Sequence, residues 1–128
     1  MVERPRQVSS AQASRPAIEA YGGGGFRVAG LRMEGSILVS ARGAWPWAVA
    51  GIAQASVASL RQLLEADPGL QILLLGCGAS MQPVPAAFRE ELRGIGVRVE
   101  PMATGAACRT FNVLLAEDRR VAAALLAT

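Results

Sequence analysis

The most constraining feature of the sequence is a strand-sized segment, residues 70–75, that is apolar at every position except Gln71. A segment of this kind is typical of a strand that is covered on both faces, as in parallel sheets. Downstream, helices are expected at residues 84–95 and 104–117, with a short strand at residues 97–100 between them. A strand–helix–strand–helix order is typical of parallel strands joined by crossover helices. The chain is therefore predicted to adopt an α/β fold.

The N-terminal part of the chain predicts shorter strands. Residues 18–21 read as a short extended segment that runs into four consecutive glycines. Residues 26–31 and 36–41 alternate between apolar and polar side chains, which is typical of strands with one buried face. We expect these two strands to form a β-hairpin whose turn lies at residues 33–35.

Two further segments connect these parts. Residues 56–66 have an apolar stripe at helical spacing, with Ser56 placed as the N-terminal cap and Asp67-Pro68-Gly69 as the stop. Residues 119–127 are rich in alanine and leucine, so the pattern fits a helix or a buried strand equally well. Trp45 and Trp47 flank Pro46 and are expected to pack at the edge of the core.

The chain has the size of one ordinary domain, with 128 residues, of which 52% are hydrophobic. No apolar run approaches the roughly 20 residues of a membrane-spanning helix. Residues 1–16 are polar and contain Arg, Ser and Pro, without the apolar centre of a signal peptide. We therefore expect a flexible tail at residues 1–16 and a single domain at residues 17–128.

Composition argues against several classes of function. All 13 basic residues are arginines scattered along the chain, whereas nucleic-acid-binding proteins usually cluster theirs. The absence of histidine removes His-based catalytic triads and most zinc sites. We therefore expect no nucleic-acid partner, no metal and no cofactor. Two cysteines without CxxC spacing do not suggest a secreted disulfide scaffold, so they favour a reducing compartment.

The turn Gly76-Cys77-Gly78 follows the buried strand and precedes a helix. In open α/β sheets, ligands bind at the carboxyl ends of parallel strands, where helix N-termini attract anions. The turn lacks the third glycine of a dinucleotide motif, so a tight turn is the simpler reading. Cys77 is the one plausible nucleophile, but no histidine is present to act as its base. Cys108 also follows a parallel-type strand, so both thiols are expected at the same edge of the sheet.

The segment that begins at Met102 is the most informative. Thr104 is placed to cap the third helix, and Arg109 and Asn112 lie three positions apart on one helix face among apolar neighbours. Such polar side chains need partners when they are buried. One reading is an internal network that ties the helix to nearby loops, together with Glu117 and Arg119. The other reading is that Arg109 contacts an anion or a partner.

Several motifs resemble a known family. They are Tyr-Gly-Gly-Gly-Gly-Phe at residues 21–26, the strand pair at residues 26–41, Leu-Leu-Gly-Cys-Gly at 74–78, Val-Glu-Pro-Met-Ala-Thr at 99–104 and the run at 106–120. The most specific is Met-x-Thr-x-x-Ala-x-Arg-Thr-Phe-Asn-x-Leu from Met102, followed by Glu117 and Arg119. Over roughly residues 17–127 the chain resembles the Mth938-like family, which includes the mitochondrial complex I assembly factor 3.

The resemblance implies a three-layer fold with a central mixed β-sheet, helices packed around it and an N-terminal β-hairpin region. It implies that residues 119–126 form the last strand, antiparallel to its neighbours. Relatives more often carry threonine between the two glycines, so Cys77 is not a family requirement. The mitochondrial relatives are implicated in assembling respiratory complex I with a second assembly factor near the inner membrane, and no catalytic residues transfer.

We therefore expect a non-catalytic binding or assembly protein. Its partners would be complex I subunits or another assembly factor, in the cytoplasm or at the inner face of the membrane, with at most peripheral membrane association. This hypothesis predicts an exposed apolar patch. The alternative is a small anionic ligand in a cleft at the Gly76–Gly78 turn and the helix N-terminus at Thr104. Candidate binding residues for ligand or partner are Gly76, Cys77, Gly78, Met102, Thr104, Arg109 and Asn112. A thiol enzyme using Cys77 is the third reading.

Overall fold

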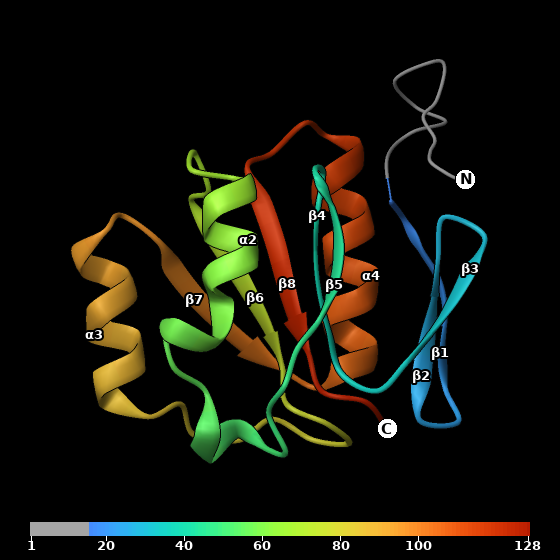
Figure 1. Cartoon of the computed structure of the whole chain (residues 1–128), viewed down its shortest axis with the longest axis horizontal. Helices are drawn as coiled ribbons and strands as arrows, with labels where there is room; N and C mark the ends of the chain where they lie inside the picture. Colours follow the sequence, from blue (N-terminus) through green and yellow to red (C-terminus); the bar gives the residue numbers. More distant parts are fainter. Residues whose placement is uncertain (1–15) are drawn as a thin grey trace.

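The computed structural model describes residues 16–128 (Figure 1). The predicted flexible tail, residues 1–16, lies outside the described residues except for Pro16. In chain order the elements are β1 (Ile18–Gly22), β2 (Gly25–Val28), β3 (Leu31–Glu34), β4 (Ile37–Ser40), β5 (Gly43–Pro46), the 3-10 turns η1 (Ile52–Gln54) and η2 (Ala58–Leu60), α2 (Arg61–Ala66), β6 (Ile72–Gly76), α3 (Ala86–Gly94), β7 (Arg98–Met102), α4 (Thr104–Ala116) and β8 (Val121–Leu125).

A five-stranded mixed sheet with the order β5-β4-β8-β6-β7 forms the centre of the molecule. Strand β6 runs parallel to both β7 and β8, and β4 runs antiparallel to both β5 and β8. The crossover helices α3 and α4 connect β6 to β7 and β7 to β8. The α/β prediction and the central mixed sheet are thus confirmed. All five residues of β6 are buried, as expected for a strand covered on both faces.

Two hydrophobic cores lie on opposite faces of this sheet and define the layers. On one face Leu73, Leu75 and the other side chains of the same parity pack against α2, α3 and the η1 region. On the other face Ile72, Leu74 and their neighbours pack against α4 and the small sheet (Figure 1). Successive side chains of a strand point to opposite faces, so one run of apolar residues serves both cores. The three-layer arrangement is therefore confirmed.

The expected hairpin between residues 26–31 and 36–41 is wrong in its pairing. Strand β2 instead pairs with β1 and β3 in a separate three-stranded sheet, and β4 pairs with β5 and β8. The β2–β3 turn is formed by Ala29 and Gly30, both at positive φ (50° and 83°), which is the geometry of a tight hairpin turn. The predicted turn at residues 33–35 carries the chain from the small sheet into the central one.

Residues 121–125 form a strand, which settles the open choice between helix and strand. The resemblance implied that this strand is antiparallel to its neighbours, and this is correct for β4 only. Strand β8 lies parallel to β6, because α4 is a crossover connection that returns the chain in the same direction. Small alanine side chains at positions 122–124 are all fully buried, so β8 is packed closely on both faces.

The remaining expectations need smaller corrections. The helix expected at residues 56–66 is a 3-10 turn followed by the six-residue helix α2, and the hydroxyl of Ser56 accepts a bond from the Ser59 amide in that turn (3.2 Å). Helix α3 begins at Ala86, after Pro85. Strand β7 continues through Pro101 to Met102, because proline is tolerated at the edge of a sheet.

Candidate partner-binding face

Thr104 stands at the point where β6, β8 and α4 meet. It is fully buried, and its hydroxyl donates a hydrogen bond to the carbonyl of Leu126 (2.8 Å) while it accepts one from the amide of Gly78 (2.9 Å). Its own amide donates to the carbonyl of Gly78 (2.8 Å). Thr104 therefore ties two strand ends to the start of α4. It does not cap the helix as predicted, because Ala103 is the N-cap and makes no side-chain capping bond.

These bonds close the place where the anion cleft was expected. Gly76 is packed so tightly that an added Cβ would come within 2.8 Å of a Leu125 methyl and 3.2 Å of the Thr104 Cα. Gly78 adopts a positive φ of 97°, a conformation that favours glycine. Gly76 is therefore required by close packing and Gly78 by its backbone conformation, and the polar groups that would bind an anion already bind each other. The geometry does not support the small anionic ligand.

The two cysteines are both free and buried. Cys77 is 1% exposed in the core on the α2 and α3 side, and its thiol lies 3.5 Å from the carbonyl of Leu75. Cys108 lies in the core on the α4 side, so the two thiols, which were expected at the same edge of the sheet, lie on its opposite faces. Burial, opposed by the nearby charge of Arg109, raises the pKa of Cys108 to about 11.

The remaining candidates on α4 lie apart from the Thr104 junction. The amide group of Asn112 bonds both the N–H and the carbonyl of Ile18. Arg109 is exposed beside it, at a small hollow of about 300 Å³ between β1 and α4 that Cys108 also lines. Met102, by contrast, is on β7 near the Thr104 junction. It is half-buried, and its carbonyl accepts a hydrogen bond from the backbone amide of Cys77 (2.8 Å). The structure thus brings together Arg109 and Asn112, and separately Gly76, Cys77, Gly78, Met102 and Thr104.

The proposed side-chain network with Glu117 and Arg119 does not form. Within residues 16–128, neither side chain makes a hydrogen bond or an ion pair, and both residues are exposed. Their backbone amides do bond to carbonyls in the last turn of α4, including that of Leu114. Of these candidates, only the Asn112 side chain bonds within the fold, to β1, while Arg109, Glu117 and Arg119 are exposed.

A different surface emerges from the fold. Residues 43–60 and 68–88 contain no charged side chain, and the core on the α2 and α3 side joins them. Trp47 is buried in that core and donates its indole N–H to the Ser59 hydroxyl (3.0 Å), which ties the first segment together. The side-chain Nε2 of Gln82 donates a hydrogen bond to the carbonyl of Cys77 (3.3 Å) across the second segment. Both loops are thus held by internal bonds as well as by packing.

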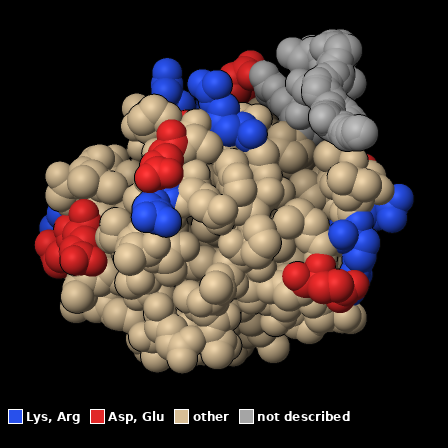
Figure 2. Space-filling view, in the orientation of Figure 1, with Lys and Arg blue, Asp and Glu red and all other residues tan. Residues whose placement is uncertain are grey.

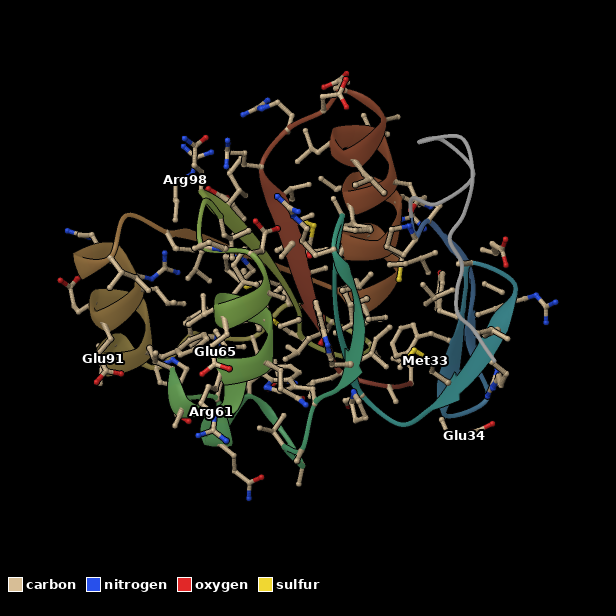
Figure 3. All side chains as sticks on the ribbon, turned by 45° about the horizontal axis from the view of Figure 1, so that its top comes forward. Met33, Glu34, Arg61, Glu65, Glu91 and Arg98 are labelled. Atoms are coloured by element: carbon tan, nitrogen blue, oxygen red, sulfur yellow. The ribbon has the colours of Figure 1, made fainter. Side chains whose placement is uncertain are left out.

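We call the exposed part of residues 43–60 and 77–88 the charge-free face. Figure 2 shows this region as the broad uncharged lower half of the view, with charged side chains gathered at its border. Arg61 and Glu65 project from α2, which follows the first segment (Figure 3). The exposed residues of the charge-free face are all neutral, and most are small: Pro46, Ala48, Ala50, Ala53, Gln54, Ala58, Ala79, Ser80, Met81, Gln82, Pro83, Ala86 and Ala87.

The charge-free face differs from the apolar patch that the assembly hypothesis led us to expect. Of the large exposed hydrophobic side chains, it contains only Met81, which is 61% exposed. The others are Tyr21, Leu31, Ile95 and Val113, which come from four different parts of the chain. The face is therefore apolar through many alanines and prolines rather than through large side chains.

Sequence reasoning missed this face, although the signal was present. The chain has no charged residue between Arg42 and Arg61, nor between Asp67 and Arg89. Only the fold places the two stretches together. Within residues 16–128 there is no group of three or more His, Cys, Asp or Glu side chains suited to a metal ion. None of the helices in the same part of the chain is long and apolar enough to cross a membrane.

The architecture and its surface define a three-layer α/β domain with one face that carries no charged side chain. A solution structure from Bordetella pertussis, named as a Mth938-like domain, shares this fold with a TM-score of 0.74 and 28% sequence identity, covering 98% of this chain and 92% of that one. The sequence model of the family described as "Protein of unknown function (DUF498/DUF598)" matches residues 18–126. The chain belongs to this family, and the Mth938-like fold inferred by resemblance is confirmed.

Two relatives are similar to this chain in sequence over most of its length. An uncharacterised protein of Rhodobacter capsulatus is 42% identical over 109 residues, which are 85% of this chain and 82% of that protein. The Danio rerio protein named NADH dehydrogenase [ubiquinone] 1 alpha subcomplex assembly factor 3 is 36% identical over 109 residues. That match spans 85% of this chain but only 63% of the Danio rerio protein, so the chain covers less than two thirds of this relative.

Proposed function

We propose that this protein is a non-catalytic assembly protein that holds a protein partner on its charge-free face. The observation that carries the proposal is the absence of charged residues across two packed segments, 43–60 and 77–88. The core of a protein–protein interface is depleted in charged side chains, while its rim remains polar. The charge-free face and its charged border follow this pattern.

The composition of the face also favours binding energetically. Burying an unpaired charge is costly, so a face without charges loses little through desolvation. Alanine and proline lose almost no side-chain entropy when they are buried, unlike long flexible side chains. A face built from Ala48, Ala50, Ala53, Pro46 and Pro83 therefore keeps the entropic cost of association small. Met81 adds one flexible apolar side chain that can adapt to a partner.

The identity of the partner is proposed from the relatives. The similarity to assembly factor 3 of NADH dehydrogenase supports a partner among the subunits of respiratory complex I or its other assembly factors. Such a partner would be met in the bacterial cytoplasm, at the inner face of the membrane. The buried position of Cys77 argues against a thiol enzyme, because a nucleophile must reach its substrate.

The proposal is tested by deleting the gene in the organism that carries it and measuring assembled complex I on native gels, together with its NADH-oxidising activity. The wild-type gene should restore any loss. A gene carrying Ala53→Glu and Met81→Glu should not, because two buried carboxylates would oppose binding. The matched control is Leu31→Glu, at a side chain that is 71% exposed and lies on β3, away from the face.

The outcomes separate the two parts of the proposal. Restoration by Leu31→Glu but not by the double variant, with all proteins equally folded by circular dichroism, supports the face as the binding surface. Full restoration by the double variant means that the face is not used. Normal complex I in the deletion strain rejects the complex I assignment.

A further inference from the structure

Strand β7 forms one edge of the central sheet, and its outer side has no partner strand among residues 16–128. The amide of Arg98 donates to the carbonyl of Gln71 (2.9 Å), and the carbonyl of Met102 accepts the amide of Cys77 (2.8 Å). These bonds direct the backbone groups of residues 98 and 102 toward β6. Backbone direction alternates along a strand, so Val99 and Pro101 direct theirs away from the sheet. The edge is therefore open to pairing at Val99.

Other features shorten this open edge. Pro101 has no N–H, so it cannot donate to an added strand. The carbonyl of Val99 accepts one bond, from the Nη1 of Arg89 on α3, and this bond is long at 3.4 Å. The donor–acceptor distance of an N–H···O hydrogen bond is usually about 2.9 Å, so the bond from Arg89 to Val99 is weak. An incoming amide could replace Arg89 at this carbonyl, while the N–H of Val99 could bond to an incoming carbonyl.

The surroundings of this edge are positively charged. A hollow of about 730 Å³ runs along β7, with Arg89 and Arg93 of α3 on one side and Arg98 and Glu100 of β7 on the other. Arg93 pairs with Glu90 (3.4 Å) and Arg98 with Glu100 (2.9 Å), both at exposed positions. Arg89 has no carboxylate partner among the described residues. Figure 3 shows Arg98 projecting outward at the start of β7.

We propose that the hollow beside β7 binds an extended acidic segment of a partner protein, which adds to the sheet as a short strand at Val99. Strand addition at an exposed edge gives affinity through backbone hydrogen bonds, and neighbouring side chains give specificity. Arg89 leaves the carbonyl of Val99 and pairs with a carboxylate of the segment in a charge-assisted bond. This surface is separate from the charge-free face, and the proposal does not depend on the proposed function.

An extended peptide fits this edge better than a free anion does. The open groups of Val99 are a donor and an acceptor, which a peptide backbone satisfies together and a phosphate does not. Arg93 and Arg98 already pair with glutamates, whereas Arg89 has no carboxylate partner among the described residues, so the lining favours a negative side chain at Arg89. Like charges on directly opposite strands repel, so an acidic segment pairs more favourably with this edge than with another acidic strand.

The test uses the full chain and a labelled probe peptide, Thr-Glu-Val-Glu-Val-Glu-Thr, with blocked ends. Binding is measured by fluorescence anisotropy, and pairing is followed by the NMR shift and the hydrogen exchange of the Val99 amide. Two control peptides replace either every Glu with Gln or both Val residues with Pro. The protein variant is Arg89→Gln. Its matched control is Arg61→Gln on α2, outside this hollow.

The expected result is saturable binding of the acidic peptide with slowed exchange at Val99. Arg89→Gln should weaken binding by about tenfold, and Arg61→Gln should change it by less than about twofold. Weak binding of both control peptides would further support the proposal. The absence of saturable binding by the acidic peptide would overturn the proposal. Equal binding by Arg89→Gln, equal binding of the Pro peptide, or unchanged exchange at Val99 would each overturn it as well.

Discussion

Asn112 and Ile18 are 94 positions apart in the sequence, and the side-chain amide of Asn112 bonds both backbone groups of Ile18. Its Oδ1 accepts the Ile18 N–H at 2.9 Å, and its Nδ2 donates to the Ile18 carbonyl at 2.8 Å. The Asn112 side chain thus satisfies backbone hydrogen-bonding groups at the edge of β1 that a neighbouring strand would otherwise satisfy. The small sheet is thereby fixed to α4.

We expect Asn112→Ala to lower the free energy of unfolding by about 1–3 kcal/mol, because both Ile18 groups lose their partner in a partly buried place. Asn112→Asp should also destabilise, since a carboxylate cannot donate to the Ile18 carbonyl. Urea denaturation provides the measurement. Val113→Ala, at the next position and 57% exposed, should stay within about 0.5 kcal/mol of the wild type. An Asn112→Ala protein as stable as this control would contradict the prediction.

Thr104→Val keeps the shape of the side chain and removes its hydroxyl. The Leu126 carbonyl and the Gly78 amide then lose their bonds in a fully buried position, and we expect about 2–4 kcal/mol of destabilisation. Thr104→Ser retains both bonds and should cost clearly less. Thermal and urea unfolding of the three proteins will rank them. Equal stability of the Val and Ser variants would mean that the hydroxyl contributes little.

Gly76→Ala should destabilise the protein by about 1–3 kcal/mol through overpacking. The new methyl would come within 2.8 Å of Leu125 and 3.2 Å of the Thr104 backbone. Gly51→Ala is the matched control, because a Cβ there meets nothing within 4 Å and its φ of −166° suits any residue. Unfolding of both variants at the same urea concentration would contradict the overpacking expected at Gly76.

Cys108 predicts a specific pH dependence. Its pKa is raised by burial to about 11, from an ordinary value of 9.0. Between these values the unfolded thiol releases its proton and the folded one keeps it, so stability falls as the pH rises. The loss is on the order of 1.4 kcal/mol per pH unit within this window. The wild type should therefore lose more stability from pH 9 to 11 than Cys108→Ala does, measured by urea unfolding. Parallel pH profiles would reject the shift.

The parts of the fold that were predictable have strong local signals. The apolar run at residues 70–75 specified β6, and the helix expected at residues 104–117 matches α4 within one residue at its end. The hairpin was mispredicted because its turn uses Ala29 at a positive φ, which alanine rarely adopts and no sequence pattern announces. The partners of Thr104, at residues 78 and 126, depend on tertiary contacts that spacing cannot reveal.

The candidate site was also predictable only where the signal was local in the sequence. Asn112 was recognised as a side chain that needs partners, but its partner Ile18 lies in an element predicted only as a short extended segment. The charge-free face was visible as two uncharged stretches, yet their meeting on one surface follows only from the shared core to which Trp47, Ile52, Phe88 and Cys77 belong. Sequence therefore indicated the residues, and the fold decided which of them act together.

Strand β8 follows all the other described strands in the sequence, yet it lies in the middle of the sheet, between β4 and β6. During synthesis, at about 5–20 residues per second, both of those strands leave the ribosome before the strand that joins them exists. Until β8 inserts, two apolar edges remain open to wrong pairing. The nascent chain is thus exposed to aggregation for seconds, and it completes its central sheet only when residues 121–125 emerge.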